Sequence, residues 1–353
     1  MGYLSLDDRQ LFKRYDREGM LICLHEMPRL CQQAWQMATD FDLPRDYARV
    51  NKVVILGMGG SAIGGELVSS LALSEAKLPI LICRHYHLPA FVDAETLVIA
   101  SSYSGTTEET LSSFEQALET GAKKLAITTG GKLKTMAEKR NVPVFTFHYK
   151  AQPRAALPFM FIPLLCFLQK LGFIGDKSSD VAETVQVLQA LSEKIGESVP
   201  LPQNPAKQLA SKLYGRLPVI YGAGIVSEVA HRWKSQLNEN SKAWAFYEVF
   251  PELNHNSVVG YQFPAELAPK IAVVLLRSAL LSQRIQLRYQ VTCQLLERAK
   301  VDYQIVDSIG TSPLSQVMSL VLFGDYTSYY LAMLNEVDPS PVKAIDFLKE
   351  KLV

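Results

Sequence analysis

The segment VVILGMGGSAIGGE, residues 53–66, decides the fold, because it joins a short apolar run to a glycine-rich turn and then to a helical pattern. Val53–Leu56, like each of the apolar runs given in the next paragraph for the first half of the chain, is too short and too uniformly apolar for a surface strand, so we expect all of these runs to be buried on both faces. Gly57, Gly59 and Gly60 follow at once, and they let backbone amides approach a ligand without Cβ atoms in the way. Such a unit predicts a parallel sheet flanked by helices.

Outward from this segment, apolar runs alternate with helical patterns. In the first half these runs are Pro79–Cys83, Thr96–Ala100, Lys124–Thr128 and Val142–Phe147. The stretch GESVPLPQNPA (196–206) then concentrates proline and polar residues, which indicates a boundary. After it the pattern restarts with PVIYGAG (218–224), which resembles VVILGMG (53–59), and it continues with strands at Ile271–Leu276 and Tyr303–Val306 and helices at 281–299 and 312–335.

The repeated pattern predicts an α/β protein with two tandem domains of one type, each a parallel sheet flanked by helices. We expect an N-terminal helical region at residues 1–45, a first domain at 46–200 and a second domain at 201–353. The second domain is expected to end in a helix that begins near Pro341.

The composition excludes several classes of protein. With 36 Lys and Arg against 35 Asp and Glu among 353 residues, the chain has no net field that would gather nucleic acid or an acidic membrane surface. Its five cysteines form no C-x-x-C pair, and its N-terminus lacks the apolar core of a signal peptide. No apolar stretch of about 18 residues runs without a break, so we expect no membrane span. These features predict a cytoplasmic protein with reduced thiols.

The glycine turn has more than one interpretation. Gly57-x-Gly59-x-x-Ala62 also satisfies the alanine-ended form of the dinucleotide fingerprint. The next strand ends in Arg84 and His85 rather than in the acidic residue that holds an NAD ribose, although an arginine there suits NADP. A tight turn that binds nothing is the third interpretation.

A second motif, ASSYSGTTEETL (100–111), has the composition of a phosphate cradle. Ser102, Ser104, Thr106 and Thr107 can donate hydrogen bonds, and the start of the following helix adds free amides with a partial positive charge. No G-K-[ST] lysine is present, which favours a phosphate monoester over a nucleoside triphosphate. The simpler alternative is a helix cap, but a cap needs only one hydroxyl.

The third motif is the run SQLNENSKAWAFYEVFPELNHNSVVG, residues 235–260, which sets two titratable groups between amides. Glu239 lies in N-E-N and His255 in N-H-N, and such surroundings could orient a general base and a proton-transferring imidazole. The alternative is that Glu239 lies near a helix end capped by Asn238 or Asn240, with His255 an ordinary loop residue.

Seven short motifs together resemble the bifunctional phosphoglucose/phosphomannose isomerase family of the sugar isomerase (SIS-domain) superfamily. They recur in family order over nearly the whole chain: GMGGS (57–61), SYSGTTEET (102–110), ITTGG (127–131), PRAALP (153–158), LNEN (237–240), NHN (254–256) and AIDFLK (344–349). The resemblance implies two SIS-type domains. It also implies that the chain interconverts glucose 6-phosphate, and less securely mannose 6-phosphate, with fructose 6-phosphate through a cis-enediol.

The resemblance also implies the roles of individual residues. The sugar phosphate is expected on Ser102, Ser104 and Thr107, with Gly59, Gly60 and Ser61 beside it. Glu239 matches the family base, His255 the histidine implicated in ring opening, and Lys349 the C-terminal lysine that contacts the sugar. Arg154 matches an arginine near the reacting carbons, where an always-charged guanidinium suits an enediolate.

This chemistry needs no metal and no nicotinamide. The only close histidine pair, His85-x-His87, has Cys83 and Asp93 as its only nearby thiol and carboxylate, and we predict no metal site there.

One departure from the family concerns the substrate range. Counting back from Lys349 places Val342 where the family has a threonine thought to admit both C2 epimers, and Ser340 is the nearest hydroxyl. Mannose 6-phosphate activity is therefore the less secure expectation, unless Ser340 replaces the threonine.

The resemblance implies a homodimer in which His255 serves the active site of the partner subunit. The aromatic residues Trp244, Phe246, Tyr247 and Phe250 fit an interface, although they fit an ordinary core equally well. Two rival functions use the same motifs: a non-catalytic SIS protein that senses a sugar phosphate, and an NADP-dependent reductase.

Overall fold

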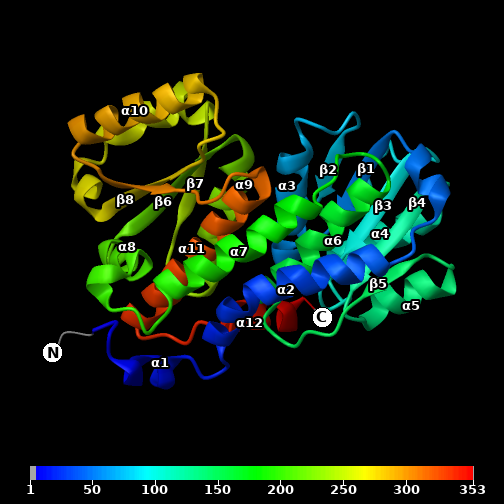
Figure 1. Cartoon of the computed structure of the whole chain (residues 1–353), viewed down its shortest axis with the longest axis horizontal. Coiled ribbons are helices and arrows are strands. Elements are labelled where there is room, and N and C mark those ends of the chain that lie inside the picture. Colours follow the sequence, from blue (N-terminus) through cyan, green and yellow to red (C-terminus); the bar gives the residue numbers. More distant parts are fainter. Residues whose placement is uncertain (1–4, 353) are drawn as a thin grey trace. The chain divides into compact units, whose positions relative to one another are not determined.

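A computed structural model describes residues 5–352, and the chain forms two compact units (Figure 1). The middle unit consists of Met27–Val185, and the terminal unit combines the residues up to Glu26 with those from Gln186 onward. Each unit contains one sheet whose paired strands are all parallel, with helices flanking it, so the predicted fold class is confirmed.

The middle unit has a five-stranded sheet in the order β2-β1-β3-β4-β5. Its strands are β1 (Lys52–Leu56), β2 (Ile80–Cys83), β3 (Thr96–Ser101), β4 (Lys123–Thr128) and β5 (Val144–Thr146). Its helices are α3 (Gly59–Ala72), α4 (Glu108–Leu118), α5 (Gly131–Lys139) and α6 (Leu157–Lys170), with parts of α2 (Met20–Asp40) and α7 (Ser178–Ile195). Strands β1 and β3 are almost wholly buried, as their uniformly apolar sequences predicted. The same prediction is wrong for β2, where Leu81 is 40% exposed because this strand lies at the edge of the sheet.

The terminal unit has a four-stranded sheet in the order β7-β6-β8-β9. Its strands are β6 (Leu217–Ala223), β7 (Phe246–Phe250), β8 (Ile271–Arg277) and β9 (Asp302–Asp307). Its further helices are α1 (Arg9–Tyr15), α8 (Pro205–Leu213), α9 (Ser227–Glu239), α10 (Gln283–Arg298), α11 (Pro313–Leu334) and α12 (Lys343–Lys351). Strands β7, β6, β8 and β9 take the same places in their sheet as β2, β1, β3 and β4 in the middle unit. The predicted duplication is therefore present in the topology.

Strand β7 was not expected from the sequence. Phe246–Phe250 lies at the edge of its sheet and pairs only with β6 among the described strands. Phe246 and Tyr247 are exposed, so the segment has neither the uniform apolar character of a buried strand nor a clean alternation.

The compact units do not follow the predicted limits of 1–45, 46–200 and 201–353. Their limits fall inside α2 and α7, since residues up to Glu26 and residues from Gln186 onward belong to the terminal unit. The proline-rich stretch 196–206 is a connection within that unit: the Asn204 side chain donates to the Gly196 carbonyl at 3.0 Å. Proline and glycine mark where the backbone turns, and here a turn does not coincide with a change of unit.

Helix α11 is the most buried long helix of the terminal unit. Among the described residues it alone is long and apolar enough to cross a membrane, by length and composition. Within the structure, 94% of its most apolar window is buried, as is typical of a core helix.

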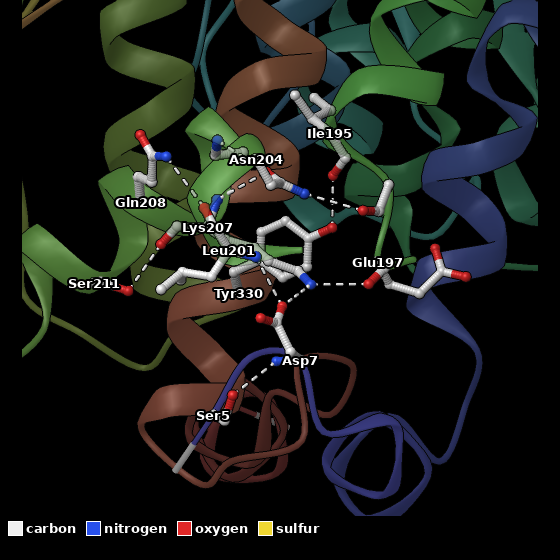
Figure 2. Close-up of polar contacts among 12 residues, drawn as sticks. Ser5, Asp7, Ile195, Glu197, Leu201, Asn204, Lys207, Gln208, Ser211 and Tyr330 are labelled. Carbon is white, nitrogen blue, oxygen red and sulfur yellow. Dashed lines mark hydrogen bonds and ion pairs between the residues drawn. The ribbon is translucent and has the colours of Figure 1, made fainter. Parts of the chain in front are cut away.

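A buried lysine fixes the N-terminal segment within the terminal unit (Figure 2). Lys207 on α8 is 0% exposed, and its Nζ donates to Asp7 Oδ1 at 3.0 Å and to the Glu197 carbonyl at 2.8 Å. The ammonium group also lies 5.7 Å from the ring centroid of Tyr330, a cation–π contact. Burying a charge is costly unless it is paired, so Asp7 is needed to keep Lys207 inside.

We predict that Asp7→Asn lowers the melting temperature by several degrees at neutral pH, because the amide leaves the buried ammonium of Lys207 uncompensated. Burial raises the pKa of the Asp7 carboxyl, but hydrogen bonds from Lys207 and the Leu201 amide, with the charge of Lys207, hold it below the ordinary 3.8. The stabilisation is therefore present above pH 3.8 and is lost as the pH falls through the lowered pKa. The melting curves of parent and variant should converge in acid.

The control is Asp46→Asn, which removes an ion pair to Lys123 whose two side chains are 49% and 35% exposed. Exposed pairs contribute little, so this variant should melt close to the parent. Equal effects of the two substitutions at neutral pH would contradict the role assigned to Asp7.

Candidate active site

Three turns meet at the carboxyl end of the middle unit's sheet. They are residues 57–60 after β1, residues 102–107 after β3, and residues 129–130 after β4. Strands β1 and β3 are neighbours, with β2 on the far side of β1, so the strand order reverses between them. In open parallel sheets, ligands bind outside the carboxyl ends of the strands at such a switch point.

The predicted phosphate loop is closed by its own hydroxyl groups. Ser102 Oγ lies 2.9 Å from Thr107 Oγ1 and accepts from the Gly105 amide at 3.2 Å. Ser104 Oγ lies 2.9 Å from Thr106 Oγ1. Ser102 is buried, whereas Ser104 and Thr106 are exposed, so the loop presents its outer hydroxyls to solvent.

The hydroxyl groups of this loop do not act as a simple helix cap. Thr107 is the residue before α4, but its side chain makes no capping hydrogen bond to the helix. The first amides of α4 therefore keep their capacity to bind an anion. This arrangement favours the phosphate cradle over the alternative in which one hydroxyl only caps the helix.

The loop needs glycine at its centre because a second turn lies against it. Gly105 has φ +64°, and a Cβ there would lie 1.9 Å from the carbonyl oxygen of Gly130. The amide of Leu133, in the first turn of α5, donates to the Gly105 carbonyl at 2.9 Å. The turns after β3 and β4 are therefore packed backbone to backbone.

The turn after β1 lies beside the segment that carries Arg154. A Cβ on Gly60 would lie 3.3 Å from the Pro153 carbonyl oxygen and 3.4 Å from Arg154 Cα. Arg154 lies in the short 3₁₀ helix Pro153–Ala156 and is 2% exposed. Ser61 accepts a hydrogen bond from the Tyr103 amide at 3.2 Å, which ties this turn to the phosphate loop.

The structure thus brings together the seven predicted residues of the middle unit: Gly59, Gly60, Ser61, Ser102, Ser104, Thr107 and Arg154. Tyr103 was not among the predicted site residues, although its backbone and its side chain both form hydrogen bonds to the surrounding segments. The sequence did offer one indication that Tyr103 belongs to the site, because it lies within the SYSGTT motif (102–107) that follows a buried strand.

Arg84 has a partner that weakens the dinucleotide interpretation. Its guanidinium pairs with Glu66, on α3, within the middle unit. An arginine that binds the 2′-phosphate of NADP must offer its charge to that ligand, and here a carboxylate already compensates it.

In the terminal unit, Glu239 is the last residue of α9. It is half-buried, and Asn240 follows it as the C-cap residue. Asn238 donates to the Ala243 carbonyl at 2.9 Å, and Asn240 donates to Ser328 Oγ at 2.9 Å. The two flanking amides therefore hold the chain around Glu239, and the position of Glu239 at a helix end with Asn240 as C-cap is the one that the alternative interpretation of this motif expected.

A buried polar network fixes the end of α9 against α11. Arg232 and Asp325 form an ion pair at 2.6 Å with both side chains 2% exposed, and Gln236 donates to the second oxygen of Asp325 at 2.8 Å. Ser241 donates to the Ser328 carbonyl at 2.7 Å, next to the bond from Asn240. Glu239 is therefore presented by a helix whose end is held in one place.

The predicted histidine and lysine lie on other elements of the terminal unit. His255 ends the 3₁₀ helix Glu252–His255, directly after β7, and is exposed. Its neighbour Asn254 is anchored to α10, donating to Thr292 Oγ1 at 2.9 Å and accepting from Arg288 at 3.1 Å. Lys349 lies on α12, a helix without buried residues.

Ser340, the hydroxyl residue nearest to the position at which the family has a threonine, lies in a segment that is bonded to the end of α9. Lys242, in the left-handed conformation with φ +52°, donates to the Glu239 carbonyl at 2.7 Å and to the Pro339 carbonyl at 3.0 Å. Ser340 follows Pro339 and is buried, whereas Val342 is the N-cap residue of α12. Through Lys242, the segment that carries Ser340 is bonded to the residue expected to be the base.

Comparisons with known proteins agree with the predicted family. Residues 202–352 match a family model described as the bacterial phospho-glucose isomerase C-terminal SIS domain. The chain is 45% identical to a bifunctional phosphoglucose/phosphomannose isomerase of Caldicellulosiruptor bescii, over 94% of this chain and 98% of that protein. It is 36% identical to a protein of the same name from Aquifex aeolicus, over 88% and 93%.

Among solved structures, a hypothetical protein of Thermus thermophilus has a TM-score of 0.72 at 17% identity, covering 98% of this chain and 92% of that chain. At this identity the likeness concerns the fold alone, and the SIS-type domain is supported by the family model that matches residues 202–352.

We predict that Gly105→Ala weakens the binding of fructose 6-phosphate at least tenfold, because its Cβ cannot fit against the Gly130 carbonyl without opening the loop. Isothermal titration of both proteins checks the affinity. The matched control is Gly172→Ala, since Gly172 has φ +76° but nothing within 4 Å of a Cβ. The control should lose some stability and keep the parent's affinity, and equal affinities for all three proteins would mean that the ligand does not use this loop.

Proposed function

Because the chain belongs to the bifunctional phosphoglucose/phosphomannose isomerase family, we propose that it interconverts glucose 6-phosphate and mannose 6-phosphate with fructose 6-phosphate. The observation that carries the proposal is the closed hydroxyl loop Ser102–Thr107 at the switch point of the sheet, bonded to a glycine turn whose Gly60 packs against the backbone of the buried Arg154. Neutral donors and helix amides suit a phosphate monoester. The buried Ser340 supports the mannose activity, since its segment is bonded to the turn after Glu239.

The proposed mechanism begins with ring opening, because sugar phosphates exist mostly as closed rings. His255 and Lys349 are proposed to move a proton between the ring oxygen and O1. Glu239 then removes the proton from C2 of the aldose, which gives a cis-enediolate with its negative charge on O1. A proton passes from the C2 hydroxyl to O1, and the carboxylic acid of Glu239 returns its proton to C1, which leaves the carbonyl at C2. Positioned proton transfer contributes roughly 10² to 10⁴ in rate, so placement and charge stabilisation supply the rest.

Arg154 is proposed to stabilise the negative oxygen of the enediolate. Its guanidinium stays charged at every relevant pH, and its burial lowers the local dielectric, which strengthens its attraction for a developing anion. The charge of the substrate's phosphate is balanced elsewhere, by the hydroxyls and the first amides of α4.

We also propose that the enzyme is a homodimer in which His255 acts in the partner's site. Within one chain, Glu239 precedes β7 and His255 follows it. The five residues of β7 span about 13 Å, so the two residues stand toward opposite ends of this strand, which fits a histidine that is supplied by another chain. The exposed aromatic residues support the interface: Trp244 is 79% exposed and Phe246 is 51% exposed, whereas Phe250 belongs to the core.

The rival functions find less support. A non-catalytic sensor would keep the phosphate loop and would not need Glu239, His255 and Lys349 at matching positions. A reductase would use the glycine turn, but it gives the hydroxyl loop no role. A cytoplasmic location also remains a proposal, supported by five scattered cysteines, none of which forms a disulfide within the described residues.

We predict that Glu239→Gln abolishes most turnover of glucose and mannose 6-phosphates while substrate affinity changes only a few-fold. The amide keeps the size of the side chain but cannot accept the C2 proton. In D₂O, deuterium should enter the product at C1 or C2 with the parent only. The control is Glu193→Gln, an exposed glutamate on α7 in the same unit, which should behave as the parent. Label exchange by the Glu239 variant would remove this residue from the base role.

We further predict that two inactive variants restore activity when their subunits are mixed. A dimer of one Glu239→Gln and one His255→Ala subunit has one site that lacks both groups and one intact site, if the histidine acts in trans. Random exchange makes half of the dimers mixed, so about a quarter of the parent activity should return. Activity that stays absent, with exchange confirmed by native mass spectrometry, would place His255 in its own subunit's site or outside the chemistry.

A further inference from the structure

Tyr103 connects all three turns at the carboxyl end of the middle unit's sheet. Its amide donates to Ser61 Oγ at 3.2 Å, in the turn after β1. Its carbonyl accepts from the Thr129 amide at 3.0 Å and from Thr129 Oγ1 at 2.7 Å, in the turn after β4. The residue itself lies in the phosphate loop after β3, so one residue's backbone fixes the relative positions of three strand ends.

The side chain of Tyr103 reaches a fourth segment. Its hydroxyl lies 2.6 Å from the Tyr149 carbonyl and 3.0 Å from the Ala151 carbonyl, and it accepts from the Ala151 amide at 3.1 Å. A phenol has one proton to donate and lone pairs to accept, so this hydroxyl can serve one carbonyl and the amide together. The segment 149–151 has no strand or helix of its own, and these bonds order it.

This ordered segment leads directly to Arg154. The Ala155 amide donates to the Gln152 carbonyl at 2.9 Å, which starts the short 3₁₀ helix, and Gly60 packs against Pro153 and Arg154 from the other side. The backbone of Arg154 is therefore held from two directions. One is the glycine turn after β1, and the other is the Tyr103 hydroxyl, which bonds to Ala151 three residues upstream of the arginine.

We propose that Tyr103 is a positioning residue that couples the phosphate loop to Arg154, so that a bound phosphate and the stabilising guanidinium keep a fixed separation. The kinetic part of this inference rests on the isomerase function proposed above. A misplacement of about 1 Å at a catalytic group can cost as much as 10² in rate, so a single hydroxyl that sets this separation matters for kcat. The phosphate contacts themselves come from other residues, so KM should depend on the hydroxyl much less.

The substitution Tyr103→Phe removes only the hydroxyl. The ring keeps its contact with Phe147, whose centroid lies 6.2 Å away, and the backbone bonds to Ser61 and Thr129 are unchanged. The matched control is Tyr47→Phe, which removes a tyrosine hydroxyl bonded to the Lys124 carbonyl at 2.7 Å, near the start of β4 in the same unit. Both variants lose a hydrogen bond from a tyrosine hydroxyl to a backbone carbonyl. Only the bond of Tyr103 lies at the carboxyl end of the sheet.

The first measurement is amide hydrogen exchange across residues 149–156. Tyr103→Phe should speed the exchange of the Ala151 amide and its neighbours, whereas Tyr47→Phe should leave that segment as in the parent. The second measurement is the kinetics with fructose 6-phosphate. Tyr103→Phe should lower kcat about tenfold with KM within about threefold of the parent.

A double-mutant cycle with Arg154→Lys then tests whether Tyr103 acts through the arginine. If it does, Tyr103→Phe should lower kcat little further in the Arg154→Lys background. Three outcomes would each overturn the proposal. The first is that Tyr103→Phe leaves amide hydrogen exchange at 149–156 unchanged, and the second is that it raises KM while kcat stays the same. The third is that the losses in kcat caused by Tyr103→Phe and Arg154→Lys multiply fully in the double variant. A parent that isomerises no sugar 6-phosphate would overturn the proposed function instead, and the exchange measurement would still decide whether the hydroxyl holds the segment.

Discussion

The in-register parallel pairing of β1 with β3 is the constraint on which the rest of the middle unit's site depends. Leu56 lies beside Ala100, so both strands end at the same level and their turns emerge side by side. Parallel strands require helical crossovers, so each turn also starts a helix and exposes free amides at the same edge. The hydroxyl loop and the glycine turn can then be joined through Tyr103, because the backbone geometry has already brought them within hydrogen-bond distance.

The duplicated topology shows how much of the site belongs to the loops. Strand β8 occupies the place in its sheet that β3 occupies in the middle unit, yet it is followed by Ser278-Ala-Leu-Leu-Ser282 instead of the hydroxyl loop. Leu280 is exposed there, and Ser278 donates to Gln316 in the core instead of facing a ligand. Within the described residues, the same scaffold therefore carries the hydroxyl loop proposed to bind phosphate after β3 and not after β8, as expected when function lies in loops on a rigid frame.

Sequence reasoning could predict the features that depend on local chemistry. Uniformly apolar runs gave the buried strands β1 and β3, and the cluster of hydroxyls after β3 indicated the loop, because both signals are complete within a few residues. The edge strand β7 escaped prediction since its exposure depends on neighbours far along the chain. Two further features also depend on tertiary contacts that no local pattern reveals. Tyr103 bonds to residues 149 and 151, about 46 residues along the chain, and the two compact units have their limits inside α2 and α7.

The buried pair of Arg232 and Asp325 is best understood through the direction it gives to α9. Such a pair adds little net stability, since desolvation of both charges offsets their attraction, but it fixes which face of the helix meets α11. Arg232, Gln236 and Asn240 lie four residues apart and supply the bonds to α11. Successive residues of a helix are rotated by about 100°, so Glu239 must project from a different face than Asn240. The network thus sets the direction of the proposed base through the helix that carries it.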